Sequence, residues 1–105
     1  MNSLPNTIFN KWFNSYEEQS EGSTEIYRPQ DYKFPLSRGR KGFEIKPNGE
    51  FISYDIGMAD GWDKSDGRWK FNPPDELVIS FSSPTKHPLI FRIIEVEDNI
   101  LKIRK

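Results

Sequence analysis

The stretch Ser37–Gly57, SRGRKGFEIKPNGEFISYDIG, decides the fold of this 105-residue chain. Asn48 and Gly49 stand between two runs that are rich in isoleucine and aromatic residues. An Asn-Gly pair in this context favours a hairpin with a two-residue type I′ turn, because both turn residues then have positive φ. The stretch therefore predicts two antiparallel strands joined at this dipeptide.

The turn sets the register of the expected hairpin. With a two-residue loop, Ile45 lies opposite Ile52, and Phe43 lies opposite Tyr54. Side chains alternate along a strand, so one face of the hairpin is expected to be apolar and the other polar, with Phe51 as a misfit on the polar face. The expected core face consists of Phe43, Ile45, Ile52, Tyr54 and Ile56.

Composition favours one small all-β domain, residues 1–105. Hydrophobic residues make up 34% of the chain and aromatic residues 14%, so the core must rest on a few large rings. Isoleucine and aromatic residues fit the surface of a pleated sheet, whereas the single alanine argues against helices. The length is that of one domain.

Charge and residue usage exclude several classes of protein. A net charge of −1 disfavours nucleic acid and anionic membranes as partners. The absence of cysteine and the single His87 rule out thiolate and histidine metal clusters, and the aspartates of the 55–66 segment do not follow the calcium-loop pattern. The start of the chain does not read as a signal peptide, and no apolar run approaches the roughly 20 residues of a membrane span. We expect a cytoplasmic monomer without metal or cofactor.

The N-terminal part of the chain leaves two alternatives open. Within Met1–Phe13, the pattern predicts either a short helical turn capped by Asn6 or a first strand that begins near Trp12. The acidic run Tyr16–Glu25 is expected to form a solvated strand and turn. Thr24 to Arg28 reads as a strand, and Gln30 to Gly39 as an irregular bridge.

Turn residues divide the second half into short strands. Met58–Gly67 is expected to be a loop, and Gly67–Phe71 and Glu76–Ser82 are expected to be strands. Leu89–Arg104 predicts a second hairpin around Asp98-Asn99. In that hairpin the expected opposite pairs are Val96 with Leu101, Ile94 with Ile103, and Glu95 with Lys102, and Arg92 falls on the same apolar strip as Ile90 and Ile94.

Seven or eight short strands without long helices between them predict antiparallel pairing. Because each strand has one apolar face, the sheet must close on itself or stack. We predict a small antiparallel up-and-down barrel with a short N-terminal helical turn, and a β-sandwich is the alternative.

Two features stand at the ends of the predicted barrel: Trp12 at the head of the first strand and the closing segment FRIIEVEDNILKIRK. Both resemble features of lipocalin-like proteins of the calycin type. The segments WFNSYEE, EIYRPQDYKFPLSRGRKGFEI and GRWKF resemble a group of small bacterial lipocalin-like proteins to which no activity is attached. The resemblance implies a barrel, and a barrel built from strands this short implies a shallow or largely filled cavity.

Arg38 and Arg40 lie at the end of the first hairpin that is far from its turn, and we expect any site at that end. Gly39 between them lets the backbone approach a ligand, and a guanidinium group suits a carboxylate or phosphate. The alternative is a structural ion pair of Arg40 with Asp55 or Asp60.

Aromatic residues inside a barrel would line a pocket for an apolar or planar ligand, although in so small a chain the same rings can simply form the core. Arg92 on its apolar strip would then anchor a carboxylate. The candidate ligand-binding residues are Tyr27, Arg28, Arg38, Arg40, Tyr54, Trp69 and Arg92.

Catalysis has little support in the sequence. No nucleophile spacing surrounds His87, and Glu17 and Glu18 would point to opposite faces of a strand. We therefore expect a non-enzymatic protein that binds a small organic or anionic ligand. The alternative is a protein–protein interaction module, such as an inhibitor, an immunity protein or a regulatory partner.

Overall fold

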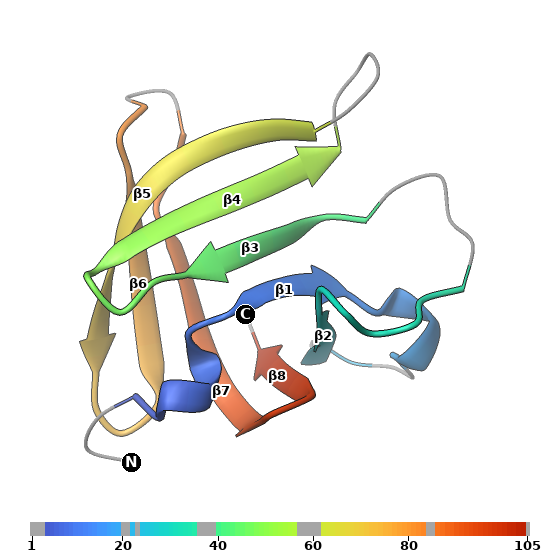
Figure 1. Cartoon of the computed structure of the whole chain (residues 1–105). Helices are drawn as coiled ribbons and strands as arrows, with labels where there is room; N and C mark the ends of the chain where they lie inside the picture. The colour runs from blue at the N-terminus through green and yellow to red at the C-terminus, as the bar shows by residue number, and fades with distance from the viewer. Residues whose placement is uncertain are drawn as a thin grey trace.

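The structure is a computed structural model that describes residues 4–19, 22, 24–35, 40–56, 62–83 and 86–104, without the side chains at 56, 62 and 63. Within these residues, eight antiparallel strands close into a barrel (Figure 1). The strands are β1 (Lys11–Asn14), β2 (Thr24–Pro29), β3 (Gly42–Ile45), β4 (Glu50–Ile56), β5 (Trp62–Asn72), β6 (Glu76–Phe81), β7 (Leu89–Glu97) and β8 (Ile100–Arg104). The predicted all-β, up-and-down barrel is confirmed.

The strand order follows the chain from β3 to β8, and β8 pairs with β2 to close the barrel. β1 lies between β2 and β3 and is antiparallel to both. Both N-terminal alternatives are present in succession, because the 3-10 turn η1 (Asn6–Ile8) is followed two residues later by β1. The predicted cap is wrong, because Asn6 is the first residue of the turn and Pro5 occupies the N-cap without a side-chain hydrogen bond. Because β2 and β3 are the two neighbours of β1, the connection between them starts on one side of β1 and ends on the other.

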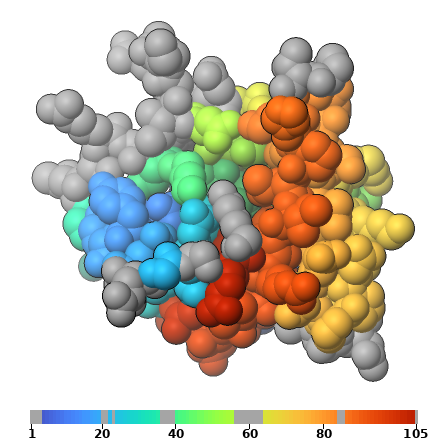
Figure 2. All heavy atoms as spheres, turned by 180° about the vertical axis from the view of Figure 1, so that it is seen from behind, coloured from blue at the N-terminus to red at the C-terminus, as the bar shows by residue number. Residues whose placement is uncertain are grey.

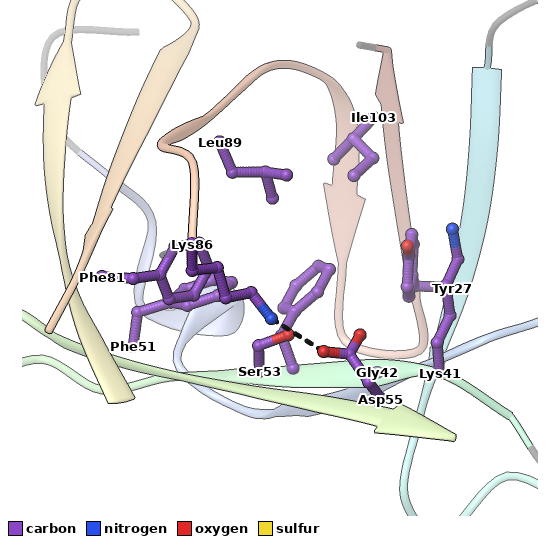
Figure 3. A pocket seen from close by; sticks show the side chains of 11 residues that line it. Tyr27, Lys41, Gly42, Phe51, Ser53, Asp55, Phe81, Lys86, Leu89 and Ile103 are labelled. Carbon is purple, nitrogen blue, oxygen red and sulfur yellow. Dashed lines mark hydrogen bonds and ion pairs between the residues drawn. The ribbon is translucent and has the colours of Figure 1, made fainter. Parts of the chain in front are cut away.

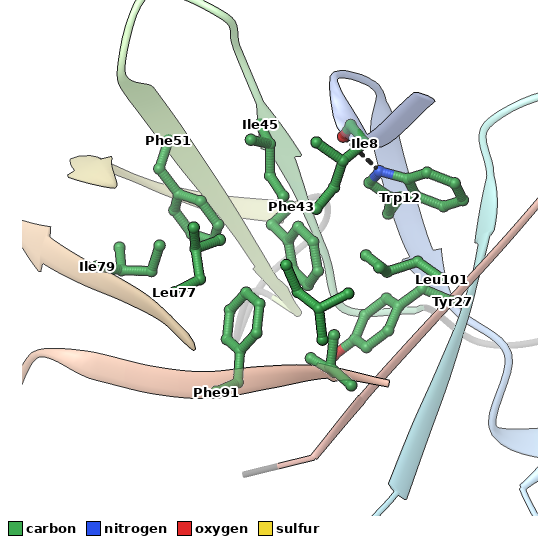
Figure 4. Packing of buried hydrophobic residues seen from close by; sticks show 12 residues of the cluster. Ile8, Trp12, Tyr27, Phe43, Ile45, Phe51, Leu77, Ile79, Phe91 and Leu101 are labelled. Carbon is green, nitrogen blue, oxygen red and sulfur yellow. Dashed lines mark hydrogen bonds between the residues drawn. The ribbon is translucent and has the colours of Figure 1, made fainter. Parts of the chain in front are cut away.

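The core rests on aromatic rings, as the composition indicates (Figure 4). Phe43 is at its centre, with ring centroids 4.7 Å from Tyr27, 5.3 Å from Phe51 and 5.9 Å from Phe91. Burying one such side chain contributes roughly 1.5–3 kcal/mol, and each ring pair adds about 0.5–1.5 kcal/mol. The core cluster comprises Ile8, Trp12, Tyr27, Phe43, Ile45, Phe51, Leu77, Ile79, Phe91, Ile93, Leu101 and Ile103.

The turn between β3 and β4 differs from the predicted type I′ turn. Gly49 has a φ of +94°, but Asn48 does not have positive φ. The Lys46 amide donates to the Glu50 carbonyl at 3.0 Å, and the Gly49 amide donates to the Lys46 carbonyl at 3.3 Å. These bonds enclose a loop of three residues, Pro47 to Gly49, in which the glycine in the left-handed region supplies the bulge typical of such loops.

The longer loop shifts the register by one residue, so the predicted core face is wrong for β4. Ile45 pairs with Phe51, and Phe43 pairs with Ser53. Phe51 is therefore in the core, where 1% of it is exposed, whereas Ile52 and Tyr54 point to the outer face. The side chain of Ile56 lies outside the described residues. A one-residue shift reverses every side chain of a strand, so the whole predicted face of β4 is exchanged.

The β7–β8 hairpin confirms part of the second prediction. Val96 pairs with Leu101, and Glu95 pairs with Lys102, whose Nζ lies 3.5 Å from Glu95 Oε1.

A bulge at Ile94 then changes the register, so that Ile93, rather than Ile94, pairs with Ile103. The predicted apolar strip is wrong at the bulge and before it: Ile94 is exposed by 47% and Ile90 by 54%. Arg92 accordingly points outward.

Two segments predicted as irregular or extended have a different structure. β5 begins at Trp62, so the predicted Met58–Gly67 loop is wrong from residue 62 onward. These residues form a strand because they pair with β4 as far as Ile56. The acidic segment Tyr16–Glu18 is the 3-10 turn η2, not a strand. Glu17 and Glu18 therefore do not alternate across a sheet as predicted.

Candidate ligand-binding site at the barrel mouth

A cavity of about 100 Å³ opens at one end of the barrel (Figure 3). This is the end of the β3–β4 hairpin that is far from its turn, the end at which the sequence leads us to expect any site. Its floor is apolar and consists of Phe43, Phe51, Phe81, Leu89 and Ile103. Its remaining lining residues are Tyr27, Lys41, Gly42, Ser53, Asp55 and Lys86.

The opposite end of the barrel is closed by the N-terminal segment. Ile8 of η1 is fully buried there, and its carbonyl accepts a hydrogen bond from Trp12 Nε1 at 2.9 Å. The ring centroids of Phe9 and Trp69 are 6.0 Å apart, and Trp69 Nε1 donates to the Lys46 carbonyl at 2.7 Å. The mouth cavity therefore lies at the end of the barrel that the N-terminal segment does not cover.

The first polar element of the mouth is an ion pair between Asp55 and Lys86. Asp55 ends the inward-facing row of β4 that begins with Phe51 and Ser53. Lys86, from the β6–β7 connection, donates from Nζ to Asp55 Oδ2 at 2.7 Å and to Ser65 Oγ at 3.1 Å. The same ammonium group lies 4.8 Å from the ring centroid of Phe81, so it contacts both the polar groups of the rim and an aromatic ring of the floor.

The second polar element of the mouth consists of Tyr27 and Lys41, which both donate to Glu25, a residue that does not line the cavity. The Tyr27 hydroxyl donates to Glu25 Oε1 at 2.8 Å, and Lys41 Nζ donates to Glu25 Oε2 at 3.1 Å. Burial, together with the neighbouring Glu25 carboxylate, raises the pKa of Tyr27 far above its usual range. Tyr27 is therefore a neutral donor at every physiological pH.

The lining of the mouth cavity is amphipathic. Aromatic rings at the floor accept an apolar group, and the lysines at the rim offer charged donors to an acidic group. Of the predicted candidates, Tyr27 lines the cavity. Arg38 and the alternative partner Asp60 lie outside the described residues.

Arg28 is held on the outer side of the barrel by Glu18. Its Nε and Nη2 donate to the two Glu18 oxygens at 3.0 and 2.7 Å, and its Nη1 donates to the Asn99 carbonyl at 2.9 Å. The Arg28 guanidinium, with help from Ser15 and Tyr32, lowers the pKa of Glu18 to about 2. The group acts as a structural clamp between η2, β2 and the β7–β8 turn.

Arg40 is 7% exposed and is held in the same way by Glu17. It also donates to the carbonyls of Asn14 and Pro35, and its guanidinium lies between the rings of Tyr16 and Phe34. Arg40 therefore forms a structural ion pair, as the predicted alternative says, but its partner is Glu17. The predicted partner Asp55 pairs with Lys86 instead.

The remaining candidates lie away from the cavity. Tyr54 is buried on the outer face, where its ring stacks on Phe13 at 6.2 Å. Trp69 belongs to the closed end. Arg92 is on the outer face and pairs with Asp75 at 3.0 Å.

The sequence reasoning missed Lys41, Ser53, Asp55 and Lys86 as lining residues. For Ser53 and Asp55 a signal existed: they alternate with Phe51, so an inward Phe51 places both in the interior. Lys86 lies in a connection between strands, where no periodicity indicates direction.

Among the described residues, no group of three or more acidic or histidine side chains is arranged to hold a metal ion. The described part of the chain also has no helix with the length and apolar character needed to cross a membrane. The chain matches no protein-family model, no curated protein and no solved structure.

Proposed function

We propose that this barrel is a non-enzymatic, lipocalin-like binding protein for a small organic molecule that has an acidic group. The observation that carries the proposal is the cavity at the mouth, in which an aromatic floor meets the ammonium groups of Lys41 and Lys86. Pockets that bind small molecules combine a mostly apolar wall with a few polar groups that fix orientation.

The size of the cavity limits the apolar part of the ligand. A cavity of roughly 150 Å³ holds a benzene molecule. The mouth cavity, at about 100 Å³, fits a slightly smaller group such as a short branched alkyl chain. Such a group would lie on Phe43, Phe81 and Leu89, with the acidic end at the rim.

Lys86 is the residue best placed to hold the acidic group. An ammonium group has three N–H donors. Within the described residues, Asp55 and Ser65 accept from Lys86, so a ligand carboxylate would share the Lys86 ammonium group with Asp55. The Lys86 side chain is 30% exposed, which gives a ligand access to it.

Isothermal titration calorimetry with 4-methylpentanoate tests this proposal. The wild-type protein is expected to bind this acid, and Lys86→Met is expected to weaken binding roughly fivefold, since a partly exposed charge pair is worth up to about 1 kcal/mol. Lys102→Met is the matched control, because Lys102 pairs with Glu95 on the outer face and should leave binding intact. Absence of binding, or equal weakening by both variants, would contradict the proposal.

A protein-binding surface is the second candidate, and it rests on Ile90 and Ile94. In the view from behind, β7 lies at the surface between β8 and β6 (Figure 2). Both isoleucines are on this strand and are about half exposed, at 54% and 47%. Sedimentation velocity of the wild type and of Ile90→Ser/Ile94→Ser tests the case in which the partner is a second copy of this chain. Identical monomeric profiles would contradict that case.

A further inference from the structure

Asp55 and Lys86 are in direct contact, and both line the mouth cavity. Lys86 Nζ is 2.7 Å from Asp55 Oδ2, and the side chains are 30% and 50% exposed. Each charge is thus partly withdrawn from water and depends on the other for compensation. Any ligand that contacts one of them changes the electrostatic environment of the other.

A purely acidic ligand would meet a competitor at this position. Its carboxylate would share the Lys86 ammonium with the Asp55 carboxylate, and two like charges in one small site repel each other. A ligand that also has an ammonium group removes this conflict, because its own cation pairs with Asp55 while its carboxylate pairs with Lys86.

The pairing of the described charges at the mouth supports the same conclusion. Lys41 of the cavity lining is paired with Glu25, with Lys41 Nζ 3.1 Å from Glu25 Oε2. Among the residues that the structure describes there, each of the two lysines thus already has a carboxylate partner. A ligand without net charge keeps both pairs compensated, whereas an acid adds a negative charge that neither pair compensates.

We infer that the ligand class is a small zwitterion, namely an α-amino acid with a short branched apolar side chain. Its amino and carboxyl groups are separated by a single carbon, a spacing that suits two rim groups in contact with each other. Its side chain would occupy the floor between Phe43, Phe81 and Leu89. This inference rests on the proposed function, since it assigns a ligand class to the same cavity.

Three compounds that share one alkyl chain test the inference: L-leucine, 4-methylpentanoate, which lacks the amino group, and 3-methylbutan-1-amine, which lacks the carboxyl group. Calorimetry on the wild-type protein is expected to show leucine binding roughly fivefold more tightly than the acid, and more tightly than the amine. This comparison needs no variant, so it does not depend on whether a variant folds.

Asp55→Asn gives an independent arm. It removes the partner of the ligand ammonium and the competitor for Lys86, so leucine is expected to lose its advantage while the acid binds more tightly than before. If the acid binds the wild type as tightly as leucine does, or more tightly, the zwitterion inference is wrong and the proposed function stands. If none of the three compounds binds, the proposed function fails as well.

Discussion

Ile45 and Phe51 lie directly opposite each other on β3 and β4, and each is only 1% exposed. Their pairing fixes the direction of every side chain that follows on β4. Ser53 and Asp55 consequently face the interior at the mouth, and Tyr54 faces outward. The three-residue loop at Gly49 thus determines both the core and the polar rim of the cavity.

The first prediction tests this register. Phe51→Ala is expected to lower the free energy of unfolding by about 3–5 kcal/mol, because it removes a ring from the centre of the core. Ile52→Ala, on the outer face, is expected to cost about 1 kcal/mol. Urea denaturation of both variants measures the difference. Equal losses of unfolding free energy, or a larger loss for Ile52→Ala, would contradict the three-residue loop and support the register of a two-residue turn.

A second prediction concerns the close approach of β1 and β3 at Gly42. A Cβ atom at this position would clash with the backbone carbonyl oxygen of Trp12 and lie 2.7 Å from the Phe13 ring. Gly42→Ala must push the two strands apart, and we expect a loss of about 2–3 kcal/mol.

Gly22→Ala is the control for this effect. Gly22 has a φ of +83°, and a Cβ atom added there would meet no atom of the described residues within 4 Å, its two chain neighbours left aside. Its substitution therefore costs only the backbone term, about 1 kcal/mol. Thermal or urea unfolding that finds Gly42→Ala no worse than Gly22→Ala would contradict the close packing of the two strands.

The third prediction is a pH dependence that arises from the Glu18–Arg28 clamp. Arg28 lowers the pKa of Glu18 in the folded protein to about 2, from an ordinary value of 4.5. The stabilisation is therefore complete above pH 4.5 and is lost as the pH falls toward 2.

Melting temperatures measured between these pH values should fall more steeply for the wild type than for Glu18→Gln. Arg28→Met breaks the same pair and should flatten the profile in the same way. A Glu18→Gln profile that runs parallel to the wild-type profile would show that the clamp does not contribute in this range.

The barrel class follows from local features of the sequence. The expected Glu76–Ser82 strand and the part of the second hairpin next to its turn each have a short-range signature, and each forms as expected. The register of the first hairpin is not determined by local sequence. An Asn-Gly pair is compatible with a two-residue or a three-residue loop, and the choice between them depends on which face of β4 packs against the core.

The site is harder to predict than the fold for a related reason. Its rim joins residues that are far apart in the chain: Lys86 and Asp55 are separated by 31 positions. Arg28 and Arg40 are natural candidates because a guanidinium group suits anions, but their partners Glu18 and Glu17 come from a 3-10 turn that the acidic run does not reveal. Long-range pairing of charges is set by barrel closure, which has no local pattern.

The most direct test of the central claim is a map of where a small amphipathic ligand contacts the barrel. Backbone amide shifts of ¹⁵N-labelled protein should be followed during titration with L-leucine and with 4-methylpentanoate. We predict that the largest changes occur at Ser53, Asp55 and Lys86 at the mouth, while Lys46 and Trp69 at the closed end stay unchanged. Changes confined to the closed end or to the outer face of β7, or no changes at all, would contradict a binding site at the barrel mouth.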